Sequence, residues 1–130
     1  MSFQNILVPT DGSEFTKAAV AKAFDLAEVA GGRVTALYVK DKYATDESAK
    51  AAVGYVSEQG KARNIPVEEA VLSGVPAEVI AGESGKYDVI VMGTLGRTGM
   101  SKVLMGSVAE KVIEGSKCPV MVVRSSPSKQ

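Results

Sequence analysis

Four short runs of apolar residues divide the chain into regular segments. Each run is continuous rather than alternating, and β-branched residues dominate, which is typical of strands in a parallel sheet covered on both faces. The four runs occupy residues 6–8, 34–39, 89–92 and 120–123. A fifth, weaker run at 67–72 contains Glu68 and Glu69, so it predicts a strand at an edge of the sheet.

Helical patterns fill the first two long intervals between these runs. Ser13 is a favourable N-cap for a first helix, and Gly31 and Gly32 mark its end. Residues 40–48 are expected to form a short mobile loop before a second helix. The apolar residues that share one helical face are Val20, Ala23, Phe24 and Ala27 in the first helix, and Ala49, Ala52, Val53 and Val56 in the second.

Two further helices are predicted in the second half of the chain. A short third helix has Pro76 in its first turn, with Val79 and Ile80 on its apolar side. A fourth helix begins near Ser107. Its apolar residues, all expected to face inward, are Val108, Ala109, Val112 and Ile113.

Strands and helices therefore alternate along the chain. Alternation at these lengths predicts an α/β fold with a single doubly wound, five-stranded parallel sheet of order 3-2-1-4-5 and right-handed crossovers. A chain of 130 residues has the usual length of one domain. We expect this domain to cover residues 1–124, followed by a flexible tail at 125–130.

Composition removes several classes of function. Fifteen basic and fifteen acidic residues cancel, so we expect no nucleic acid and no membrane among the partners. The chain has no histidine, which excludes histidine-based acid–base catalysis and the usual zinc sites. The single cysteine, Cys118, cannot form an internal disulfide and is expected to be a small buried hydrophobic residue. With no signal peptide apparent in the first residues, the expected location is cytoplasmic.

A ligand site is predicted from the topology. Open α/β sheets bind ligands beyond the carboxyl ends of the strands, where the winding direction reverses; for this order, the crevice lies between the first and fourth strands. The loop after the first strand, 9–13, reads Pro-Thr-Asp-Gly-Ser, and the glycine-rich loop that begins at 93 leads to Gly106 and Ser107. Glycines and a helix N-terminus both favour phosphate. Alternatively, the glycines only permit a tight loop and Ser107 only caps the helix.

Two common phosphate loops do not occur in this sequence. No G-x-G-x-x-G follows the first strand, and no G-x-x-x-x-G-K-[ST] is present. A standard dinucleotide site and a Walker-type ATPase are therefore poor interpretations.

The spacing Gly93-x2-Gly96-x9-Gly106-Ser107 resembles the nucleotide-binding signature of the universal stress protein family, in the subset that binds ATP. The resemblance extends over nearly the whole chain, and segments 6–13, 88–94 and 118–123 carry it together with the signature. It implies an adenine nucleotide alpha hydrolase-like fold. The family region that corresponds to 40–48 is often longer and could help to close over the base. The short segment in this chain therefore affects the expected affinity for the nucleotide, but not the expected position of the site.

The resemblance also implies a role for each matching position. The adenosine would lie against Pro9, Thr10, Asp11 and Val39, with Gly93 on the ribose side, and the phosphates against Gly96, Gly106, Ser107 and Val108. Met92, next to Gly93, is also expected to bind the nucleotide. A carboxylate repels a triphosphate, so Asp11 should face ribose hydroxyls or the base, or reach the phosphates through a metal ion; it could instead cap the first helix. Arg97 either pairs with a phosphate or is solvated, and Lys102 is expected to be solvated.

Three functions follow from this reading. The first is a binding module for ATP, with ADP or AMP as alternatives and with Mg²⁺ or Mn²⁺, whose nucleotide state changes partner association in a stress response. The second is a slow ATP-hydrolysing or autophosphorylating enzyme, and the third a nucleotide-free structural dimer. The last strand, with Val120 and Val122, would be an apolar edge that pairs with a second copy, and the resemblance implies the same homodimer.

Overall fold

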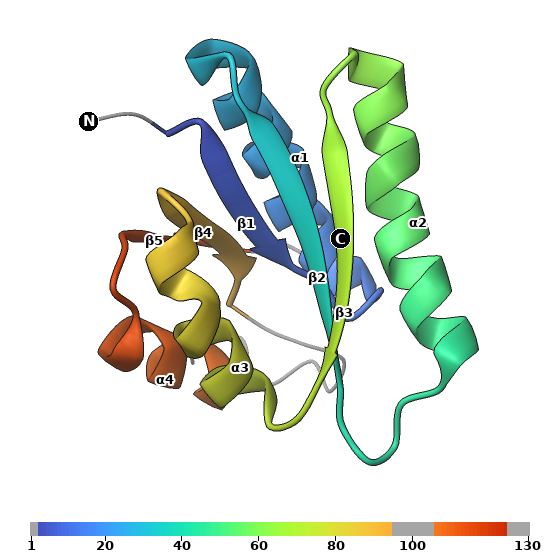
Figure 1. Ribbon diagram of the computed structural model, residues 1–130, viewed down its shortest axis with the longest axis vertical. Coiled ribbons are helices and arrows are strands. Elements are labelled where there is room, and N and C mark those ends of the chain that lie inside the picture. The colour runs from blue at the N-terminus through green and yellow to red at the C-terminus, as the bar shows by residue number, and fades with distance from the viewer. Residues whose placement is uncertain (1–2, 95–105, 125–130) are drawn as a thin grey trace.

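A five-stranded parallel sheet forms the centre of the computed structural model, which describes residues 3–94 and 106–124 (Figure 1). The strand order is β3-β2-β1-β4-β5, with every neighbouring pair parallel, so the predicted topology is confirmed. The strands are β1 Asn5–Pro9, β2 Arg33–Lys40, β3 Val67–Ser73, β4 Val89–Gly93 and β5 Val120–Val123.

Helices cover both faces of the sheet and enclose two apolar layers. Helices α1 (Glu14–Ala30) and α2 (Asp46–Arg63) lie on one face, and α3 (Pro76–Glu83) and α4 (Ser107–Gly115) on the other (Figure 1). Residues that alternate along each inner strand belong to opposite layers: Ile6 packs toward α1 and α2, and Leu7 packs toward α3 and α4. This two-sided burial explains why the strand sequences are continuous apolar runs.

The predicted inner faces of the first two helices are confirmed. All eight residues named for them are buried. Gly31 ends α1 in the left-handed conformation, at φ 66°, and its amide donates to the carbonyl of Ala27. This conformation costs glycine little, so the sequence marks the end of the helix correctly.

The predicted start of α4 near Ser107 is confirmed, because Ser107 is the first helical residue and Gly106 is the N-cap. The predicted inner face of this helix is wrong at two of its four residues. Ala109 and Val112 are buried, whereas Val108 and Ile113 are 38% and 44% exposed. At 3.6 residues per turn, these two side chains lie about 70° to either side of the buried stripe. Among the described elements, this short helix packs mainly against α3 and β5.

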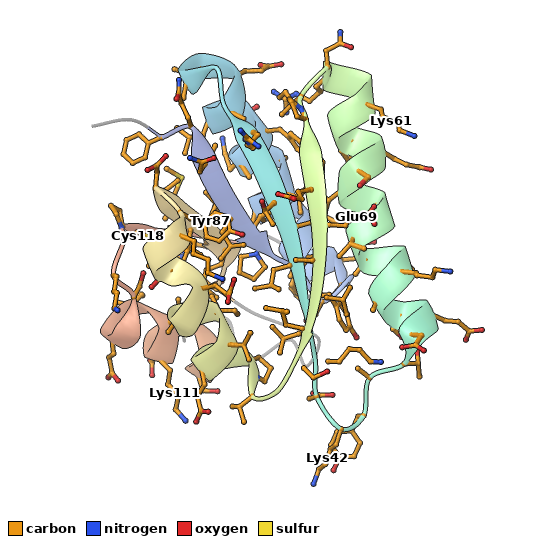
Figure 2. All side chains as sticks on the ribbon, in the orientation of Figure 1. Lys42, Lys61, Glu69, Tyr87, Lys111 and Cys118 are labelled. Carbon is orange, nitrogen blue, oxygen red and sulfur yellow. The ribbon has the colours of Figure 1, made fainter. Side chains whose placement is uncertain are left out.

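The loop between β2 and α2 is shorter than the predicted 40–48, because α2 begins at Asp46 and leaves only 41–45 outside regular structure. Thr45 is the N-cap and accepts a hydrogen bond from the Ser48 amide at 3.0 Å. Lys40 pairs with Asp46, and its hydrogen bond lowers the pKa of the Asp46 carboxyl. Lys42, at the tip of the loop, points away from the protein (Figure 2).

Two smaller features complete the fold. A short 3₁₀ helix at Ser84–Lys86, which the sequence analysis did not predict, joins α3 to β4. Cys118, on the link between α4 and β5 (Figure 2), is half-buried against the α3–α4 layer rather than fully buried.

Residues 125–130, predicted as a flexible tail, lie outside the described residues. None of the helices described is both long enough and apolar enough to cross a membrane.

Candidate functional site

A cavity of about 340 Å³ opens at the carboxyl ends of β1, β2 and β4. The N-terminal ends of α3 and α4 provide its remaining walls. Because β1 and β4 are neighbours at the point where the strand order reverses, this is the crevice that the topology predicts. Its size falls within the range of small-molecule sites, roughly 300–1,000 Å³.

Nine of the eleven residues predicted for the site line this cavity. They are Pro9, Thr10, Asp11, Val39, Met92, Gly93, Gly106, Ser107 and Val108. The other two, Gly96 and Arg97, lie outside the described residues, as does Lys102. Segments separated by almost a hundred positions in the sequence therefore meet around one cavity.

The cavity also has lining residues that the sequence analysis missed. They are Thr16, Leu37, Tyr38, Asp41, Pro76, Ile80, Thr94 and Ala109. Most of them follow from the topology: residues at the end of β2 and at the start of α3 lie at the same edge of a parallel sheet as the end of β1. The hydroxyl of Tyr38, which is only 1% exposed, has no hydrogen-bond partner within the described part of the chain.

The loop between β1 and α1 is fixed by its own side chains. The Thr10 amide donates to the carbonyl of Leu37 at 2.9 Å, which ties the loop to β2. The Gly12 amide donates to Thr10 Oγ1 at 3.1 Å, and the Ser13 amide donates to Asp11 Oδ1 at 2.9 Å. Gly12 has φ 82°, a conformation that other residues adopt only with strain. The loop is thus a defined turn rather than a mobile connection.

The first helix uses its predicted N-cap only in part. Ser13 occupies the N-cap position, but its side chain makes no capping hydrogen bond, and its buried hydroxyl has no partner among the described residues. Asp11 instead binds the Ser13 amide with one carboxylate oxygen. Within the described residues its other oxygen, Oδ2, accepts no hydrogen bond. Asp11 therefore combines a local structural role with a free acceptor at the cavity.

The start of α4 brings a helix N-terminus to the opposite wall. The Gly106 amide donates to the carbonyl of Thr94 at 2.6 Å, which joins the end of β4 to the start of the helix. Glu110 donates the first helical hydrogen bond, to Gly106, at 3.1 Å. The amides of Ser107, Val108 and Ala109 precede it, so they have no carbonyl of the helix to bind. Amides that have no partner within the helix, together with the helix dipole, favour an anion.

The charged side chains among the described residues of the cavity are carboxylates. Asp11 and Asp41 line it, whereas none of the lining residues that the structure describes is a lysine or arginine. Asp41 Oδ1 accepts a hydrogen bond from the Tyr43 amide at 2.9 Å. Walls of this kind suit ligand groups that donate hydrogen bonds, such as hydroxyls and amines. The described residues include no cluster of three acidic or cysteine side chains that could hold a metal ion.

Comparison with known proteins identifies the family of this chain. The profile of the universal stress protein family matches residues 2–124. The chain belongs to this family. A universal stress protein of Methanocaldococcus jannaschii, MJ0531, is 34% identical over 146 residues, which cover 98% of this chain and 85% of the relative.

Solved structures of similar proteins agree with this assignment. One of them is the structure of the protein MJ0577 from the same archaeon, which was determined to assign a biochemical function. Its TM-score is 0.87 at 29% sequence identity, and the match covers 98% of this chain and 100% of MJ0577. A universal stress protein crystallised in complex with cAMP has a TM-score of 0.81 and 26% identity, covering 97% of this chain and all of that one. The universal stress protein described here therefore has the α/β fold of adenine nucleotide alpha hydrolase-like proteins.

Proposed function

We propose that this universal stress protein binds an adenine nucleotide, ATP, in the cavity at the carboxyl ends of β1, β2 and β4. The observation that carries the proposal is that nine residues, selected by their positions in the sequence, line one cavity of suitable size. The similar universal stress protein that binds cAMP supports the choice of an adenine nucleotide. In this role the protein is a binding module, and its nucleotide state changes the partners with which it associates.

The two walls of the cavity suit opposite ends of a nucleotide. The carboxylate of Asp11 would accept hydrogen bonds from ribose hydroxyls, and Val39 would contact the adenine. The free amides at the start of α4 suit the phosphates, and Gly106 leaves room for a phosphate oxygen because it has no side chain. This orientation keeps the phosphates away from both carboxylates, where their charges would repel.

The spacing of three glycines and a serine supports membership of the ATP-binding subset of the family. Gly93 ends β4 and Gly106 is the N-cap of α4, so two of the three glycines lie on either side of one cavity. The third, Gly96, lies outside the described residues. A divalent ion, Mg²⁺ or Mn²⁺, would be held by the phosphates and by water, with no metal site supplied by the protein alone.

We propose further that the protein is a homodimer that pairs through β5. This strand lies at an edge of the sheet, and its residue Met121 is 41% exposed. Its four residues are all apolar, whereas edge strands of monomers usually carry charges that prevent pairing. Two copies of β5 related by a two-fold axis would join the two sheets.

ATP hydrolysis by this protein is expected to be very slow, far below the ~10 s⁻¹ of a typical enzyme. The chain contains no histidine, and bound phosphates would lie away from the two carboxylates of the cavity. Phosphate release should be measured with excess ATP and Mg²⁺, using a Gly106→Val preparation as the control for contaminating ATPases. Sustained turnover above about one per second that Gly106→Val abolishes would favour an enzyme over a binding module.

The experiment that tests the proposed function is the analysis of nucleotide retained by the purified protein. A denatured extract, run against ATP, ADP and AMP standards, should contain adenine nucleotide in a fixed ratio to the protein. Protein that retains none should then bind ATP in a calorimetric titration. If it neither retains nor binds an adenine nucleotide, the nucleotide-free structural dimer becomes the better interpretation.

A further inference from the structure

Thr16 is a buried threonine that links the residues of the β1–α1 loop. It lies in the first turn of α1 and is only 7% exposed. Its hydroxyl donates to the carbonyl of Ser13 at 2.9 Å and lies 3.2 Å from the hydroxyl of Thr10. Thr10, Asp11 and Thr16 also line a second cavity, of about 330 Å³, on the α2 side of the loop. The loop therefore borders two cavities, and its own hydrogen bonds help to fix its shape.

The positions of the hydroxyl hydrogens follow from this network. A hydroxyl has one hydrogen to donate, and that of Thr16 is used by the Ser13 carbonyl. In the Thr10–Thr16 pair, Thr10 must then be the donor. Thr10 Oγ1 in turn accepts the Gly12 amide at 3.1 Å. The hydrogen of Thr10 is therefore used by Thr16 and is not offered to a ligand.

The consequence is that this loop offers acceptors to the cavity. Thr10 can give a ligand only a lone pair, and Asp11 offers the carboxylate oxygen that the Ser13 amide does not use. Acceptors of this kind select ligand groups that donate, and on a nucleotide these are the ribose hydroxyls and the amino group of the base. A ligand without a ribose hydroxyl would leave an acceptor without a partner, which is costly in a partly closed cavity.

We propose that Thr16 is a positioning residue that sets the selectivity of the site for ribose over deoxyribose. It acts through Thr10 and Asp11: it fixes the direction of the Thr10 hydroxyl and, through Ser13, the turn that holds the Asp11 carboxylate. This inference rests on the proposed binding of an adenine nucleotide in the same cavity.

The test compares Thr16→Val, which removes the hydroxyl at nearly constant volume, with Thr16→Ser, which keeps it. Thr35→Val is the matched control, because Thr35 is buried to a similar degree, 4% exposed, and does not line the cavity.

Calorimetry gives the Kd of each protein for ATP, 2′-deoxy-ATP and 3′-deoxy-ATP. The loss of one or two hydrogen bonds should weaken ATP binding by about tenfold in Thr16→Val. The preference of the parent for ATP over the deoxy nucleotides should also fall toward one. Thr16→Ser and Thr35→Val should both keep the affinity and the preference of the parent.

Each outcome separates this inference from the proposed function. A parent protein that binds none of the three nucleotides contradicts the proposed function. If the parent binds ATP and Thr16→Val has the same Kd and the same ribose preference as Thr35→Val, the role of Thr16 is disproved and nucleotide binding stands. A Thr16→Ser variant as weak as Thr16→Val also disproves it, because the methyl group rather than the hydroxyl would then matter. If Thr16→Val lowers the Tm more than Thr35→Val does, Thr16→Ala replaces it and must show the same loss of preference.

Discussion

Asp11 joins a structural task to a binding task within one side chain. One oxygen accepts the Ser13 amide at the start of α1, and the residue also lines the cavity. The sequence left open whether Asp11 holds the ligand or caps the helix. The geometry permits both, because the two oxygens of a carboxylate can accept separate hydrogen bonds.

Two substitutions separate the tasks of Asp11. Asp11→Asn keeps an oxygen for the Ser13 amide, so its free energy of unfolding should stay within about 0.5 kcal/mol of the parent. Asp11→Ala loses that hydrogen bond and should be less stable by about 1 kcal/mol. Both should weaken ATP binding, because both remove the carboxylate. Denaturant unfolding and calorimetry measure the two effects; unchanged affinity in both variants would leave Asp11 with only its structural task.

Gly106→Val should weaken ATP binding at least tenfold, because the branched side chain would occupy space that a phosphate oxygen needs. The backbone itself would not be strained: Gly106 has φ −67° and ψ 156°, which valine adopts readily. Gly54→Val is the matched control, since a Cβ at Gly54 in α2 meets no atom within 4 Å. Equal Kd values for a folded Gly106→Val and the control would show that this wall does not bind phosphate.

The residues of the site could be predicted from the sequence where a strand ends in an unusual loop. Pro9, Thr10 and Asp11 follow β1 directly, and Gly93 ends β4. Thr16 could not be predicted in this way, because a threonine in a helical pattern is equally compatible with a solvent-exposed position. Its importance depends on two hydroxyls that lie 3.2 Å apart, and only the folded loop shows that distance.

At the scale of elements, the packing of α2 on the sheet depends on one close approach. A Cβ added at Gly60 would lie 2.3 Å from Val67 Cγ2 and 2.8 Å from the carbonyl oxygen of Ile65. The end of α2 therefore lies directly against the start of β3. Arg63 continues this contact toward α1, with an Nη2 atom 2.9 Å from both Asp25 and Glu28.

Gly60→Ala should lower the free energy of unfolding by about 1–3 kcal/mol, since the added methyl group forces α2 away from β3. Gly54→Ala, on the same helix, should instead raise it by about 0.5–1 kcal/mol, because its site is open and alanine favours the helix. Denaturant titration of both variants measures the difference. A Gly60→Ala protein as stable as Gly54→Ala would mean that α2 shifts without cost.

The elements themselves were predictable because the chain repeats one pattern. Buried parallel strands need continuous apolar runs, and the two long helices have a clear apolar face. The short helix α4 was predicted less well. Its four apolar residues suggested a wide inner face, but only two of them are buried. The width of the face depends on which neighbours cover the helix, and this is a property of the tertiary structure.

At the scale of the whole molecule, the two edges of the sheet differ. The edge strand β3 carries Glu68 and Glu69, whereas β5 has no charged residue between Val120 and Val123. Charges on an edge strand oppose pairing with another molecule. The proposed dimer therefore uses β5 and leaves β3 free.

The parent protein should sediment at micromolar concentration with about twice its chain mass of 13.5 kDa. Val122→Lys should shift it toward the monomer, because a charge would be buried between paired strands. Val71→Lys places the same charge on the opposite edge, where Val71 is 44% exposed, and should leave the dimer intact. A parent that sediments as a monomer, or a Val71→Lys variant that dissociates as readily as Val122→Lys, would contradict pairing through β5.

The most direct test of nucleotide binding in this cavity is a crystal structure of the protein grown with saturating ATP and Mg²⁺. The nucleotide should lie between the two walls, with ribose hydroxyls against Asp11, adenine against Val39, and phosphates at the amides that follow Gly106. An empty cavity under these conditions, or a nucleotide bound at another surface, would contradict the proposed site.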